Sequence, residues 1–154
     1  MDTKLYHLRM NVWLTPCIST EPPEIEITLN DDWIYRGSLT TTTCFGIDRL
    51  LPAGPQEFAI KFTNKKDSDT TPTGDKAVII DRVEFNDINS ERFAWAGVYR
   101  PEYPEPWYSE QTIRPEPLLK SQTYMSWHGQ WTLIFTTPIF TWIHELEDLG
   151  WIYS

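Results

Sequence analysis

Apolar and polar residues alternate along most of the chain, which is the two-residue period of a half-buried β-strand. The segment 4–14 shows this pattern first, and one of its faces carries Tyr6, Leu8, Met10, Val12 and Leu14. The segments 24–29, 39–47 and 57–63 repeat the pattern, with turn-forming residues between them. Together these blocks predict an antiparallel meander with one buried face.

The second half of the chain predicts further strands. The run 77–80 is apolar on both faces, which is typical of a central strand, and 92–99 also predicts a strand. The segments 124–127 and 131–135 flank Gly129 and predict a β-hairpin that turns at this glycine.

The C-terminal segment has a different period. Thr137 and Pro138 form a helix start signal, and Gly150 is a stop signal. Between them, helical spacing relates Ile139, Trp142, Ile143, Leu146 and Leu149. We therefore expect one short amphipathic helix over residues 138–149. The whole pattern predicts a mainly β protein, with residues 1–154 forming a single antiparallel β-sandwich that is jelly-roll-like or immunoglobulin-like.

Residues 100–120 contain five prolines, a density that argues against a helix or a central strand. We expect an ordered Pro-rich loop there, because Tyr103, Trp107 and Tyr108 lie among the prolines. Three roles are open for these rings: packing against the sandwich, contacting a protein, or stacking on a sugar. Trp151 and Tyr153 in the C-terminal tail are the other predicted binding contacts.

Charge and composition exclude several classes of partner. The 154 residues include 13 Lys and Arg against 22 Asp and Glu, a net charge of −9. Such a chain repels phosphate backbones and anionic lipids, so we expect neither a nucleic acid nor a membrane as partner. The N-terminus lacks the charged and apolar regions of a secretory signal, which predicts assembly in a cytoplasm.

A polar loop over residues 64–75 is the candidate metal site. Asp67, Asp69 and Asp75 supply the oxygen ligands that Ca²⁺ prefers. The loop lacks the EF-hand spacing, and Lys65 and Lys66 would oppose a cation. We therefore predict a solvated loop and no cofactor, with a calcium site as the alternative.

The chain shows no catalytic signature. His7, His128 and His144 lie in no recognisable nucleophile or metal motif, and carboxylates are too numerous to single out a pair. Asp81 and Arg82 interrupt an apolar strand, where we expect them to form structural contacts. The prediction is that the protein is not an enzyme.

Two long stretches resemble a known group of proteins. They are NKKDSDTTPTGDKAVIIDRVEF with the following FAWAGVYRPEYPEPW, and MSWHGQWTLIFTTPIFTWIHELEDLGWIY. They are similar to small virion-associated proteins of contractile-tailed phages that infect marine cyanobacteria, from about Ile25 to the C-terminus. The resemblance implies a non-catalytic accessory of the virion, in the capsid decoration, neck, tail or baseplate, with other phage structural proteins as partners.

A looser likeness is to calcium-dependent carbohydrate-binding modules of the xylan-binding type. It rests on the Asp-rich loop and on the strand Val78-Ile79-Ile80-Asp81-Arg82-Val83. Thr73-Gly74-Asp75-Lys76 precedes this strand, where the modules carry an Asp-Arg-Asn run. This likeness implies a sandwich fold and, as the alternative function, a carbohydrate-binding module for adsorption to host-surface polysaccharide.

Overall fold

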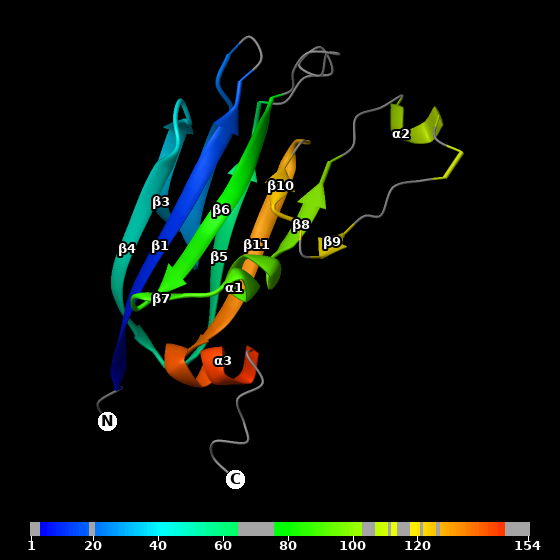
Figure 1. Ribbon diagram of the computed structural model, residues 1–154. Helices are drawn as coiled ribbons and strands as arrows, with labels where there is room; N and C mark the ends of the chain where they lie inside the picture. The colour runs from blue at the N-terminus through cyan, green and yellow to red at the C-terminus, as the bar shows by residue number, and fades with distance from the viewer. Residues whose placement is uncertain are drawn as a thin grey trace.

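The protein is a two-layered β-sandwich, seen in a computed structural model (Figure 1). The structure describes residues 4–18, 21–64, 76–102, 107–110, 112–113, 118–120, 122–125 and 127–146, with the backbone alone for 107 and 108. The prediction of a mainly β antiparallel sandwich is confirmed, because every strand pair is antiparallel.

The first sheet has five strands, with β10, β6, β1 and β4 in that order and β7 paired to β6. Their bounds are β1 Leu5–Cys17, β4 Thr43–Pro52, β6 Ala77–Phe85, β7 Ile88–Asn89 and β10 Tyr124–Met125. The prediction that β6 is a central strand agrees with its place between β1 and β10.

The second sheet has six strands in the order β3-β2-β5-β11-β8-β9. Their bounds are β2 Glu24–Leu29, β3 Asp32–Ser38, β5 Gly54–Phe62, β8 Val98–Pro101, β9 Leu119–Lys120 and β11 Gly129–Thr137. β11 is therefore central, although it is the last of the described strands in the sequence.

Three short helices accompany the sheets in the described part of the chain: α1 Glu91–Trp95, α2 Trp107–Glu110 and α3 Ile139–Leu146. In Figure 1, α3 lies at one end of the sandwich and α2 lies apart from the sheets. Among these helices, none is long and apolar enough to cross a membrane.

The core fills the space between the sheets, where one cluster of buried side chains joins both layers. The alternating residues predicted to face inward from β1 are buried, namely Leu8, Met10, Val12 and Leu14. Phe85 of β6, Phe93 of α1, Phe135 of β11 and Trp142 of α3 form a ring cluster with centroids 4.9–6.1 Å apart. The two sheets and two helices therefore share one apolar interior.

Two predicted segments have another structure. Residues 91–95 form α1 in place of part of the predicted strand 92–99, because the Ser90 side chain accepts from the Arg92 backbone N–H and caps a helix. The predicted hairpin around Gly129 does not exist, because β10 pairs with β6 while β11 belongs to the other sheet. Gly129 begins β11 and forms no hairpin turn.

The other differences concern the ends of elements. α2 forms one helical turn within the segment 100–120, where the prolines led us to expect a loop. The predicted helix 138–149 begins at Ile139, and Thr137 belongs to β11. The Thr137 hydroxyl donates to the Pro52 carbonyl at 2.5 Å. Residues 147–149 lie outside the described residues.

Candidate ligand-binding groove

A groove crosses the outer face of the six-stranded sheet, on the side away from the core. Along β5 and β11 the buried residues alternate with outward-facing ones. The inward set is Phe58, Ile60, Phe62, Trp131, Leu133 and Phe135. The outward set, on the opposite face, includes Glu57, Lys61, Gln130, Thr132 and Ile134, all of which line the groove.

Strand register places the outward residues in cross-strand rows. In one row Lys61 of β5 is opposite Gln130 of β11, which is opposite Arg100 of β8. In the next row Thr132 is opposite Val98, which is opposite Lys120 of β9. A third row pairs Glu57 with Ile134. Four strands therefore contribute to one continuous floor.

The groove has a volume of about 670 Å³ and is open to solvent. Its lining alternates hydrogen-bonding groups with apolar ones. Gln130 and Thr132 lie side by side, with the Gln130 Nε2 donating to the Thr132 Oγ1 at 3.0 Å. Val98 is half-buried beside them, and Ile134 is 60% exposed. Such a mixed surface suits a ligand that is polar at its edges and apolar on its faces.

An exposed aromatic ring lies on the same outer face, toward β3. Trp33 is opposite Thr28 of β2. Ile27 and Leu29, on either side of Thr28, are buried, so Thr28 faces outward and the Trp33 indole lies on the same outer side. The ring is 57% exposed, and the guanidinium of Arg36 lies 5.6 Å from its centroid. Arg36 is also 3.5 Å from the Glu26 carboxylate. The sheet thus offers an aromatic platform beyond the end of the groove.

Two glycines let β8 approach β11 beneath the groove. A Cβ on Gly129, which has φ +152°, would lie 2.3 Å from the Arg100 carbonyl oxygen. A Cβ on Gly97 would lie 2.1 Å from the buried Trp131 indole. The Tyr99 hydroxyl accepts from the Trp127 backbone N–H at 3.0 Å. These close contacts hold Arg100 and Val98 in register with β11.

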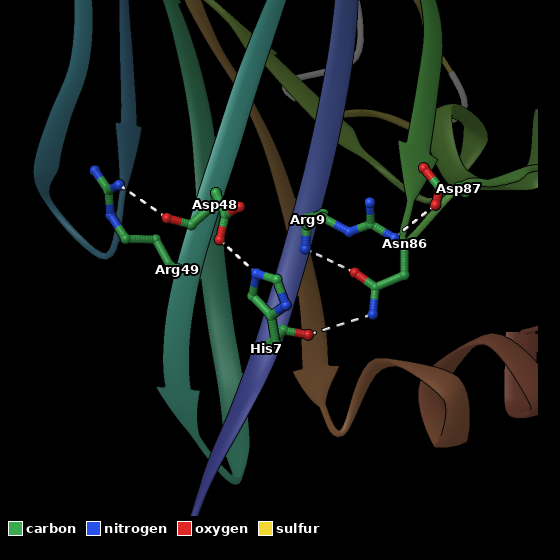
Figure 2. Close-up of polar contacts among 6 residues, drawn as sticks. All are labelled: His7, Arg9, Asp48, Arg49, Asn86 and Asp87. Carbon is green, nitrogen blue, oxygen red and sulfur yellow. Dashed lines mark hydrogen bonds and ion pairs between the residues drawn. The ribbon is translucent and has the colours of Figure 1, made fainter.

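The outer face of the five-stranded sheet carries a separate polar network (Figure 2). Arg9 of β1 donates to the Asp87 carboxylate at 2.5 Å, and the His7 ring nitrogen contacts Asp48 of β4 at 2.5 Å. Asn86 accepts from the Arg9 backbone N–H and donates to the His7 carbonyl. The network ties the turn after β6 to β1 and β4, and its charged groups already have partners within the protein.

The Asp81 and Arg82 positions make structural contacts on this second face, as predicted. Thr15 donates to the Asp81 carboxylate. The Arg82 guanidinium lies 4.0 Å from the Trp13 ring centroid and 3.3 Å from the Glu84 carboxylate. Both residues are exposed, which is why neither needs a partner in the core.

The predicted binding and metal-ligating side chains all lie outside the part of the chain that the structure describes, so their arrangement stays a prediction. Trp107 and Tyr108 begin α2, but their side chains lie outside the described residues, as do Tyr103, Trp151 and Tyr153. The predicted calcium ligands Asp67, Asp69 and Asp75 also lie outside them. Within the described segments, no group of three or more His, Cys, Asp and Glu is placed to hold a metal ion.

Sequence reasoning missed the groove residues. The signal for them was present, because Lys61, Gln130 and Thr132 occupy the polar positions of alternating strands. What the sequence did not show is that β5, β11, β8 and β9 are neighbours, since these strands are separated along the chain.

No protein-family model and no curated protein matches the chain. Among solved structures, the selenomethionine form of vCBM60 aligns with a TM-score of 0.53 and 11% identity over 82% of this chain and 89% of its own. It was described in the context of a circular permutation that links two families of calcium-dependent carbohydrate-binding modules. vCBM60 in complex with galactobiose gives a TM-score of 0.49 and 12% identity over 81% of this chain and 96% of its own. At these identities the first comparison shows the fold, an antiparallel β-sandwich shared with vCBM60.

Proposed function

We propose that this chain is a carbohydrate-binding module that holds a glycan in the groove of its six-stranded sheet without transforming it. The observation that carries the proposal is the lining of the groove. Amide and hydroxyl groups of Gln130 and Thr132 lie among the apolar side chains of Val98 and Ile134. A sugar presents hydroxyl groups at its edges and C–H groups on its faces, so each kind of lining group has a counterpart.

The shape of the site also supports the proposal. The groove is open to solvent and crosses four strands, so a segment of a sugar chain can lie within it. Trp33, on the same face, offers the flat ring on which a sugar face stacks. The sandwich shared with vCBM60 is consistent with this function, although a fold alone does not establish one.

Attachment to a phage particle is the wider role that the sequence resemblance suggests. There the module would help the virion adsorb to host-surface polysaccharide. The contacts predicted for Tyr103, Trp107, Tyr108, Trp151 and Tyr153 with other virion proteins stay predictions, as does the virion location. The comparisons with known proteins give no support to a phage family, and mass spectrometry of purified virions would test the location.

A matched pair of threonines on β11 tests the groove directly. Thr132 lines its centre, whereas Thr136 is on the same face of the strand but outside it. Thr132→Met places a longer side chain in the floor and removes a hydroxyl. We expect it to weaken binding on a glycan array roughly tenfold or more, the size of one lost central contact, and Thr136→Met to leave binding unchanged.

The array is read with and without calcium, because Asp67, Asp69 and Asp75 stay a predicted alternative site for this ion. Equal loss of binding in both variants would place the glycan elsewhere. The absence of any glycan bound under either condition would refute the proposed function.

A further inference from the structure

The basic side chains of the protein are unevenly partnered. Among the described residues, those outside the groove each have a contact within the protein: Lys4 with the Tyr6 ring, Arg9 with Asp87, Arg36 with Glu26, Arg49 with the Asp48 carbonyl, Lys76 with Glu21, Arg82 with Glu84, and Arg92 with the Leu146 carbonyl. In the described part of the chain, the side chains of Lys61, Arg100 and Lys120 alone make no such contact. All three line the groove.

The three cations come from three of the four strands that form the floor of the groove. Lys61 and Arg100 are in the row that crosses Gln130, and Lys120 is in the next row, beyond Val98. Lys61 and Arg100 flank β11, so their backbones are roughly 10 Å apart, two strand spacings. The carboxylates of the lining lie toward the two ends, with Glu57 beside Ile134 and Glu102 following β8.

This arrangement opposes the overall charge of the molecule. The chain has a net charge of −9, yet the groove lining holds three cations against two carboxylates, and none of the three cations makes an ion pair with a described residue. The neighbouring carboxylates have other partners: Glu26, opposite Lys61, is near Arg36, and Glu102, two residues after Arg100, is near His128. An anionic ligand would supply the missing partners, because a guanidinium and an ammonium both form charge-assisted hydrogen bonds with oxyanions. The acidic remainder of the surface would meanwhile repel extended polyanions such as nucleic acids.

We propose that the ligand of this groove is an acidic polysaccharide, whose carboxylate or sulfate groups are bound by Lys61, Arg100 and Lys120. This inference rests on the proposed function and names its ligand class. The hydroxyl and C–H groups of the same polymer contact Gln130, Thr132 and Val98, while the charged groups project to the three cations. A binding site with both features distinguishes an acidic glycan from a neutral one.

The test uses two pairs of polymers that share a backbone and differ in their anionic groups. Polygalacturonate is compared with its methyl-esterified form, and dextran sulfate with dextran, by isothermal titration calorimetry on the full chain. We expect one or both anionic polymers to bind roughly tenfold or more tightly than their neutral counterparts, with binding weakened by added salt. The pair that responds identifies carboxylate or sulfate as the recognised group.

Two triple variants with the same change in net charge locate the effect. The first variant removes the groove cations through Lys61→Gln, Arg100→Gln and Lys120→Gln. The second removes cations of the other sheet through Lys4→Gln, Arg9→Gln and Arg49→Gln. We expect the first to weaken anionic binding roughly 10- to 100-fold, from three lost ion pairs, and the second to change it by less than about threefold. Melting temperatures confirm that both variants fold.

Each remaining outcome overturns the inference. If neutral polymers bind as tightly and Thr132→Met still weakens binding, the module stands but its ligand is not acidic. If polyglutamate or duplex DNA binds as well as the anionic glycans, the groove recognises polyanions in general. If neither these four polymers nor the glycan array gives binding, the proposed function fails together with its ligand.

Discussion

At the scale of single residues, Cys44 shows how neighbours set the reactivity of an exposed side chain. Partial burial raises the pKa of its thiol, the Glu84 carboxylate raises this pKa further, and the Arg82 guanidinium lowers it. Because the thiolate is the reactive form, alkylation of Cys44 is slow near neutral pH and accelerates as the pH rises toward the raised pKa.

Glu84→Gln removes the carboxylate that raises this pKa and releases Arg82 from its 3.3 Å ion pair. We expect the pKa of Cys44 to fall, so that iodoacetamide alkylates it several-fold faster at pH 8 and the rate reaches its plateau at a lower pH. Peptide mass spectrometry separates Cys44 from Cys17. Glu57→Gln, on the other sheet, is the control, and an equal acceleration there would contradict the assignment to Glu84.

At the scale of elements, the packing of β8 against β11 depends on a missing side chain. Gly129→Ala would bring a Cβ to 2.3 Å from the Arg100 carbonyl oxygen, which is backbone and has little freedom to move. We expect this variant to lose about 2 kcal/mol or more of unfolding free energy, from strain and overpacking, and to bind glycan more weakly because Arg100 shifts.

Gly54→Ala is the matched control for Gly129. Gly54 also has a positive φ, +126°, and is opposite Thr137 at the other end of the β5–β11 ladder. No atom lies within 4 Å of its added Cβ, so this variant bears the conformational cost without the clash. Urea unfolding of both variants measures the difference, and equal destabilisation would show that the contact with Arg100 is unimportant.

Most strands follow from the alternation of polar and apolar residues, because each sheet buries one face. β2 has the bounds predicted for it, Glu24–Leu29. The pattern failed where a local signal or a distant partner decided the structure. Ser90 caps a helix inside a segment of strand-like composition. β1 continues through Pro16, where the sequence predicted a break. β4 pairs with β1 only as far as Leu14, so beyond this residue one side of β1 is an unpaired edge. Proline has no backbone N–H, and an edge tolerates its absence.

At the scale of the whole molecule, the sequence predicts the layers but leaves open which strands are neighbours. Lys61, Arg100 and Lys120 are on strands far apart in the chain, and their meeting depends on the order β5-β11-β8-β9. Sequence reasoning favoured aromatic residues in the Pro-rich segment instead, since aromatic residues among prolines can be recognised without knowing which strands are neighbours. A groove built from outward residues on several strands becomes recognisable only once strand pairing is known.

The joining of the two sheets is itself open to test through the ring cluster between them. Phe85 of β6 contacts Phe93, Phe135 and Trp142, which come from α1, the other sheet and α3. Phe85→Ala therefore removes a contact shared by both layers, and we expect it to reduce the unfolding free energy by about 3–5 kcal/mol.

Phe140→Ala is the control, because Phe140 is on α3 but 51% exposed, and the loss of unfolding free energy in this variant should be below about 1 kcal/mol. If the sandwich is one cooperative unit, far-ultraviolet circular dichroism and tryptophan fluorescence will report the same midpoint in urea for each variant. Separate midpoints in Phe85→Ala would show that the sandwich no longer unfolds as one cooperative unit once this shared contact is lost.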